Sequence, residues 1–155
     1  MGRFVFIAGP NDSGKSARAE ALTAAAPGPR YYIATMVPKT EDNLARIERH
    51  RRQRAGLGFT TLELPERIAD APVPPDAAVL LEDLSNLLAN RMFAEHAPPP
   101  RDCLEAVYRE VLSLRARTAF LAVVSIAGLD PADYEGETAD YVRALNELNR
   151  RLKTL

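Results

Sequence analysis

Short apolar runs alternate along the chain with longer segments whose apolar positions recur at helical spacing. The apolar runs predict β-strands at residues 3–8, 31–34, 59–64, 77–81 and 119–126. The segments between them predict helices at residues 13–26, 40–54, 65–71, 84–95, 101–117 and 137–152. Because strands and helices alternate, we expect an α/β fold of three layers, in which helices cover both faces of a mainly parallel central sheet.

Composition narrows the class of protein. The chain has 155 residues and a formal net charge of -1, which suits one domain spanning residues 1–155 and disfavours binding to nucleic acid through bulk charge. No apolar run approaches the roughly 18 residues that a membrane span needs. Cys103 is the single cysteine, so no internal disulfide can form. We therefore expect a protein of the reducing cytoplasm.

A glycine-rich motif follows the first predicted strand and opens the first predicted helix, which is the context that identifies a phosphate-binding loop. In such a loop, backbone N–H groups and the helix N-terminus surround the phosphates. We expect Lys15 to reach the β- and γ-phosphates of ATP or GTP, and the Ser16 hydroxyl to bind Mg²⁺. The fold expected is therefore of the P-loop NTPase type. The motif consists of Gly9, Pro10, Asn11, Asp12, Ser13, Gly14, Lys15 and Ser16.

Two acidic residues follow the continuous apolar strand at residues 77–81. A carboxylate at the carboxyl end of a central strand beside a phosphate loop can hold Mg²⁺ through water. The alternative role is capping the helix that begins at Leu84. We assign Glu82 to the metal and nucleotide site and Asp83 to the helix cap.

The predicted helix at residues 40–54 carries a histidine among arginines. Arg46, His50 and Arg54 are spaced four apart, so they share one face, whereas Leu44 and Ile47 are expected to dock on the sheet. Neighbouring positive charges favour a neutral imidazole, which is a nucleophile, and the guanidinium groups would hold a phosphate in front of it. The alternative is a basic helix that faces solvent or contacts RNA.

The remaining chemistry-bearing residues are expected to be structural. His96 precedes a proline run and is expected at the surface or at a helix end. Cys103 has no neighbouring histidine in the sequence and is expected to be a small buried hydrophobe. Tyr31, Tyr32 and Phe59 are expected to pack in the core rather than to stack on bases.

Several segments in a fixed order resemble the bifunctional adenosylcobinamide kinase / adenosylcobinamide-phosphate guanylyltransferase family of cobalamin biosynthesis. A strand ending in Tyr-Ile-Ala-Thr, an acidic stretch, and a helix reading Arg-Ile-x-x-His are typical of that family. The likeness spans nearly the whole chain. Besides the phosphate loop, the matching segments are residues 32–35, 41–51, 61–65, 80–82, Asn90 and 149–152.

The resemblance implies two phosphate chemistries. The first is phosphorylation of the aminopropanol hydroxyl of adenosylcobinamide by a nucleoside triphosphate. The second is transfer of GMP from GTP to that phosphate through a guanylylated histidine, which here would be His50. Mg²⁺ and Lys15 would offset charge on the departing pyrophosphate. The resemblance also implies a homo-oligomer, with a trimer as the expected form.

Some positions depart from the family pattern. Pro10 and Asp12 stand where the family has glycine and arginine, and residues 125–128 read Ser-Ile-Ala-Gly in place of Asn-Glu-Val-Gly. These departures keep two alternatives open: a P-loop small-molecule kinase without guanylyl transfer, and a nucleotide-binding regulatory protein. The sequence stops after the last predicted helix, where the family continues with another strand. We therefore expect a sheet edge that is exposed or covered by a partner chain.

Overall fold

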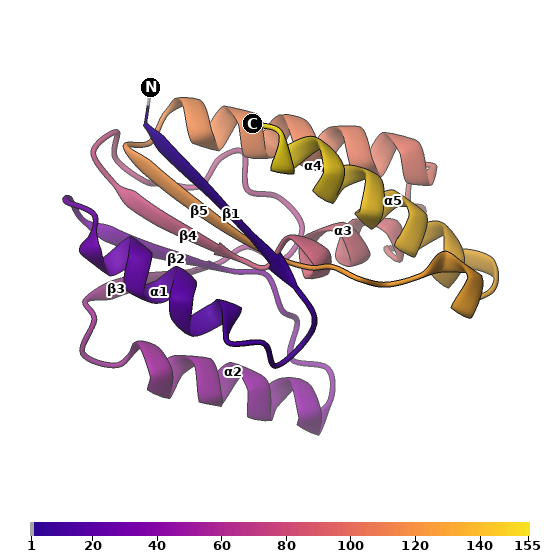
Figure 1. Cartoon of the computed structure of the whole chain (residues 1–155), viewed down its shortest axis with the longest axis horizontal. Coiled ribbons are helices and arrows are strands. Elements are labelled where there is room, and N and C mark those ends of the chain that lie inside the picture. The colour runs from indigo at the N-terminus through magenta and orange to yellow at the C-terminus, as the bar shows by residue number, and fades with distance from the viewer. Residues whose placement is uncertain (1) are drawn as a thin grey trace.

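The computed structural model describes residues 2–155 and contains a five-stranded parallel sheet (Figure 1). The sheet order is β1-β5-β4-β2-β3, and every neighbouring pair is parallel. All five predicted strands are therefore confirmed. Their bounds are β1 Arg3–Gly9, β2 Arg30–Ala34, β3 Phe59–Glu63, β4 Ala78–Glu82 and β5 Phe120–Ile126.

Helices lie on both faces of the sheet, which confirms the predicted three-layer α/β fold. In Figure 1, α1 (Lys15–Ala25) and α2 (Glu41–Arg54) lie on one side of the sheet, and the later helices lie on the other. No helix among residues 2–155 combines the length and the apolar character needed to cross a membrane. The later helices are α3 Leu84–Met92, α4 Pro100–Ala116, the 3₁₀ turn η1 Pro131–Asp133 and α5 Gly136–Lys153.

Strands β4 and β5 lie at the centre of the core. Every residue of β4 is buried, as is every residue of β5 except Ile126. Successive side chains point to opposite faces, so Val79 and Leu81 pack with α3, α4 and α5, whereas Ala78 and Leu80 pack with α1. The continuous apolar run is explained by burial on both faces of a parallel sheet.

The predicted helix at residues 65–71 is absent; the segment is a loop of bends and turns. Three charged side chains of the α3–α4 layer satisfy its backbone instead. Glu110 accepts from the N–H groups of residues 68 and 69, and Arg91 and Arg117 donate to loop carbonyls. These hydrogen bonds replace those that a helix would make within itself.

The expected docking of α2 on the sheet is only partly correct. Leu44 has an exposed fraction of 54%, so it contributes almost nothing to the core. Ile47 is half-buried and lines a pocket beside His50. The helix begins with Thr40, whose side chain accepts from the Asn43 N–H, as the sequence predicts. Most of the helix faces solvent, and polar contacts attach it to the body of the molecule.

Strands β1 and β3 form the two edges of the sheet within the described residues. β1 pairs with β5 along its full length, and its register runs from Arg3 opposite Phe120 to Gly9 opposite Ile126. All strands point the same way, so their carboxyl ends meet at one edge of the sheet. This is where ligands bind in open α/β folds.

Candidate functional site

The phosphate loop connects β1 to α1, as the sequence predicts. The helix begins at Lys15, and Gly14 before it has φ 79°, in the left-handed region that glycine adopts at little cost. Lys15 Nζ donates to the Pro10 carbonyl across the loop at 3.0 Å. The loop thus places an ammonium group at the N-terminus of a helix, an arrangement suited to anionic groups.

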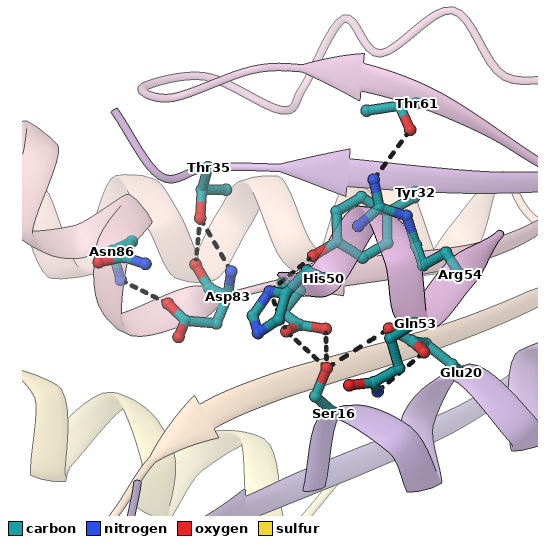
Figure 2. Close-up of polar contacts among 11 residues, drawn as sticks. Ser16, Glu20, Tyr32, Thr35, His50, Gln53, Arg54, Thr61, Asp83 and Asn86 are labelled. Carbon is teal, nitrogen blue, oxygen red and sulfur yellow. Dashed lines mark hydrogen bonds and ion pairs between the residues drawn. The ribbon is translucent and has the colours of Figure 1, made fainter. Parts of the chain in front are cut away.

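Ser16 lies against the carboxylate at the end of β4. Its Oγ lies 3.0 Å from Glu82 Oε1 and 2.9 Å from Oε2 (Figure 2). The two residues are 66 positions apart in sequence, and the parallel arrangement of β1 and β4 brings them together. The two predicted metal ligands therefore share one site.

The same carboxylate also holds the histidine. His50 Nδ1 lies 3.1 Å from Glu82 Oε2, and the Tyr32 hydroxyl lies 3.5 Å from the same nitrogen. An Nδ1–H that donates to Glu82 leaves the lone pair on Nε2. Glu82 thus joins the phosphate loop to the imidazole.

Burial changes the proton affinity of both partners. Burial lowers the pKa of His50 below its usual value, and the positive charges of Arg54, Arg49 and Arg46 lower it further. Burial raises the pKa of Glu82 to about 7, while the hydrogen bond from Ser16 opposes that rise. The neutral imidazole expected from the flanking arginines is therefore favoured mainly by burial.

The predicted arginine stripe divides into two environments. Arg46, together with Arg49, lines the cleft in front of the phosphate loop. Arg54 instead is buried, with its guanidinium carbon 3.5 Å from the centre of the Tyr32 ring. Its Nη2 donates to Thr61 Oγ1 at 3.2 Å. Arg54 therefore supports Tyr32 and lowers the pKa of His50, whereas Arg46 and Arg49 face the cleft.

Two residues from the segments that carry the resemblance, Thr35 and Asn90, hold the backbone at the end of β4. Thr35 Oγ1 contacts both the N–H and the carbonyl of Asp83 at 2.8 Å. Asn90 Nδ2 donates to the Thr35 carbonyl and to the Pro65 carbonyl. Asp83 Oδ1 accepts from the Asn86 N–H at 2.7 Å, which confirms Asp83 as the cap of α3. These contacts hold the backbone that presents Glu82.

A cleft of about 280 Å³ opens over the phosphate loop. His50, Glu82 and Asp83 line this cleft and also a second, much smaller pocket of about 40 Å³ toward β2 and β3. His50 thus lies at the wall between two spaces. The cleft side holds Asn11, Asp12, Ser13, Gly14, Lys15, Ser16, Arg46, Arg49 and Gln53.

The oxygen atoms present fit Mg²⁺. The ion prefers hard oxygen ligands and commonly takes one or two from the protein, with water and substrate phosphates completing its shell. Ser16 Oγ and the Glu82 carboxylate supply such a pair beside the loop. Among residues 2–155 no group of three His, Cys, Asp or Glu side chains could hold a metal alone. The pair therefore suits a metal that arrives with a phosphate group.

Sequence reasoning missed four contributors to this site: Glu20, Tyr32, Arg49 and Gln53. Tyr32 was expected to pack, and its ring does pack in the core, but its hydroxyl reaches the imidazole. Glu20 and Gln53 meet through a hydrogen bond of 3.0 Å between α1 and α2. Glu20 lies four residues after Ser16 and Gln53 three after His50, so helical spacing from the predicted site was the available signal.

The altered loop at residues 125–128 has its own anchor. Ser125 Oγ donates to Asn149 Oδ1 at 2.6 Å, and Asn149 Nδ2 donates to the Ile126 carbonyl. Ser125 is fully buried, so it serves the packing of α5 on the sheet. As predicted, His96 is exposed and Cys103 is buried.

The fold and the site define the class of protein: an α/β P-loop protein with a histidine facing its phosphate-binding cleft. The family of cobinamide kinase / cobinamide phosphate guanyltransferase matches residues 5–155. The chain belongs to this family, whose members are kinase and guanylyltransferase enzymes of cobalamin biosynthesis. Comparison with curated proteins finds no match. The family expected from the ordered motifs is confirmed.

Proposed function

We propose that the chain uses one cleft for both reactions of its family and that His50 carries the guanylyl group. The observation that supports this is the shared carboxylate. Glu82 contacts Ser16 of the phosphate loop and Nδ1 of His50 at about equal distances, between 2.9 and 3.1 Å. A nucleotide whose phosphates lie on the loop would therefore lie beside the imidazole.

In the first reaction, the hydroxyl of the aminopropanol arm of adenosylcobinamide attacks the γ-phosphorus of a nucleoside triphosphate. The loop N–H groups and Lys15 bind the phosphates, and Arg46 and Arg49 add positive charge at the cleft. Mg²⁺, held by Ser16 and Glu82, would neutralise charge on the phosphate oxygens. The bond from the γ-phosphorus to its bridging oxygen breaks, the nucleoside diphosphate leaves, and the proton of the attacking hydroxyl passes to solvent.

In the second reaction, Nε2 of neutral His50 attacks the α-phosphorus of GTP. A phosphorus–nitrogen bond forms, and the bond to the bridging oxygen breaks, releasing pyrophosphate. Glu82 holds Nδ1–H and stabilises the positive charge that develops on the ring. The phosphate of adenosylcobinamide phosphate then attacks the same phosphorus, and Nε2 leaves with its electron pair.

A kinase without guanylyl transfer is the second candidate. Asp12 lines the cleft and places a carboxylate beside the phosphates, where it repels them. Residues 125–128 lack the amide and carboxylate that the family pattern has there. Asp12 belongs to the phosphate loop, and residues 125–128 lie at the end of β5 and just after it. Both features therefore concern nucleotide or acceptor binding and leave His50 in place.

Assembly and location complete the proposal. The resemblance supports a homo-oligomer, with a trimer as the expected form, acting on nucleotides and adenosylcobinamide-type molecules. The single cysteine supports the cytoplasm, and the net charge of -1 favours these substrates over nucleic acid. Light scattering on the purified chain measures the assembly directly. A monomer at micromolar concentration would contradict the expected trimer.

The test incubates the chain with α-labelled GTP and Mg²⁺, denatures it and measures label on the protein. We expect label that is lost in acid, present in His96→Ala and absent in His50→Ala. Kinase turnover with ATP and adenosylcobinamide is expected to persist in His50→Ala. Equal labelling of wild type and His50→Ala would contradict the assignment, and kinase turnover without any label would favour the second candidate.

A further inference from the structure

Glu20 is a buried carboxylate on α1 to which the reactions above give no role. Its exposed fraction is 2%, and it lies one helical turn after Ser16. One carboxylate oxygen, Oε1, lies 3.4 Å from Ser16 Oγ. The other, Oε2, accepts a hydrogen bond from Gln53 Nε2 at 3.0 Å (Figure 2). The carboxylate of Glu20, which lies on α1, therefore contacts both Ser16 at the start of α1 and Gln53 of α2, the helix that carries His50 (the histidine helix).

This position is costly for a carboxylate. Burial raises the pKa of Glu20, and the hydrogen bond from Gln53 and the charge of Arg54 oppose the rise. Within residues 2–155, Glu20 has no ion pair at 4.0 Å or less. An apolar side chain would fill the same space without this cost. The hydrogen bond from Gln53, together with the longer contact to Ser16, is therefore what a carboxylate adds at this position.

Gln53 belongs to the helix that carries the nucleophile. It follows His50 by three residues, so the two side chains lie on neighbouring parts of one face, and both line the phosphate cleft. Arg54 is the one buried residue of α2, so apolar packing does little to fix the helix. Side-chain contacts attach it instead: Asn43–Val37, His50–Glu82, Arg51–Glu63, Gln53–Glu20 and Arg54–Thr61.

Two of these contacts lead to the phosphate loop. His50 reaches Ser16 through Glu82, and Gln53 reaches Ser16 through Glu20. The first contact includes the nucleophile itself, whose ring must be free to attack and leave. The second joins Gln53 to Glu20 and involves neither nitrogen of the imidazole.

We propose that Glu20 and Gln53 are positioning residues for guanylyl transfer: their hydrogen bond sets the separation between the histidine helix and the phosphate loop. This inference rests on the proposed guanylyl-histidine reaction. The transfer of the γ-phosphoryl group needs the loop but not the histidine, so the pair matters for one reaction and not for the other.

An exchange of the two side chains tests the proposal. Gln53→Glu places a second carboxylate about 3 Å from Glu20 and turns attraction into repulsion. The double variant Glu20→Gln with Gln53→Glu restores one donor and one acceptor in reversed order. Glu48→Gln is the matched control, because Glu48 is exposed on the same helix and pairs with Arg52.

Three quantities are measured on each purified chain: the rate of labelling by α-labelled GTP, kinase turnover, and hydrogen exchange of the α2 amides. We expect Gln53→Glu to slow labelling at least about tenfold, since a displacement of 1 Å can cost about a hundredfold. Because Gln53 lines the cleft, the added charge weakens nucleotide binding for both reactions. Both rates are therefore measured at saturating nucleotide, where kinase turnover is expected to fall less than labelling. The α2 amides are expected to exchange faster. The exchanged pair is expected to recover labelling and protection, and Glu48→Gln to match wild type.

Equal labelling of Gln53→Glu and wild type would overturn the proposal. So would a parallel loss of labelling and kinase turnover, or an exchanged pair that labels no better than Gln53→Glu. If wild type takes no label, the proposed function fails, and hydrogen exchange alone then tests whether the Gln53–Glu20 contact holds α2 against α1. Unchanged α2 protection in Gln53→Glu would then overturn that contact as well.

Discussion

At the scale of single residues, Glu82 organises the site. Its carboxylate accepts a hydrogen bond from the Ser16 hydroxyl and lies beside His50 Nδ1, so one group contacts both the predicted metal site and the nucleophile. Burial raises its pKa to about 7, and Asp83 and Glu20 add negative charge nearby. The folded chain therefore holds a carboxylate that would ionise more readily in the unfolded chain. Burial thus makes the ionised form of Glu82 unfavourable, although the proposed metal site and nucleophile both need that form.

Glu82→Gln in metal-free buffer tests this cost. A carboxyl whose pKa rises on folding from 4.5 to about 7 contributes stability below pH 4.5, and that contribution is lost as the pH rises through 7. The free energy of unfolding of Glu82→Gln, taken relative to that of wild type, is expected to rise by on the order of 1–3 kcal/mol from pH 5 to pH 8. Urea unfolding at both pH values measures the change. A difference between variant and wild type that is independent of pH would contradict the raised pKa.

At the scale of elements, the sequence predicted all five strands and most helices because burial imposes clear patterns. β4 is apolar throughout since both its faces are covered, and α2 begins at Thr40 with its cap. The segment at residues 65–71 was wrongly expected to be helical. Its partners come from α3 and α4, and contacts so distant in sequence leave no local pattern.

The candidate site shows the same limit. The phosphate loop could be predicted because its residues are contiguous, and Glu82 because strand ends share one edge of the sheet. The placement of Arg54 under Tyr32, rather than in front of His50, depends on how α2 packs on β2 and β3. Helical spacing alone gives the shared face of a helix but not the surface that this face contacts.

Glu110→Gln tests the anchoring of the 65–71 loop. The carboxylate is buried, accepts from two backbone N–H groups and pairs with Arg91. A glutamine loses the ion pair and places an amide N–H₂ near donors. We expect a loss of about 2–4 kcal/mol in the free energy of unfolding, with labelling by GTP unchanged in the folded chain. A loss below about 0.5 kcal/mol, the range of surface changes, would contradict this role.

At the scale of the whole molecule, a chain of net charge -1 brings three basic side chains, Lys15, Arg46 and Arg49, to one cleft. Asp12, Glu82 and Asp83 line the same cleft, so it holds both phosphate-binding cations and carboxylates. This balance suits a polyphosphate that carries Mg²⁺ and does not make the chain a general polyanion binder. The parallel sheet contributes by bringing the carboxyl ends of β1, β2 and β4 to the same edge.

Nucleotide binding should therefore stabilise the fold as a whole. Saturation at about a hundred times the Kd adds about 2.7 kcal/mol, which raises Tm by several degrees in a chain of this size. We expect MgGTP to raise the Tm of wild type, to raise it less in the presence of excess EDTA, and to leave Lys15→Ala almost unchanged. A Tm shift in Lys15→Ala equal to that of wild type would place the triphosphate elsewhere.

The most direct test of the central claim is to locate the guanylyl group on the chain. After reaction with MgGTP at alkaline pH, cleavage after glutamate releases residues 49–63, which contain His50 and no other histidine. Mass spectrometry is expected to find one GMP adduct on this peptide, and none on the peptide that holds His96. An adduct on another peptide, or none in a chain that binds GTP, would contradict the assignment of His50 as the nucleophile.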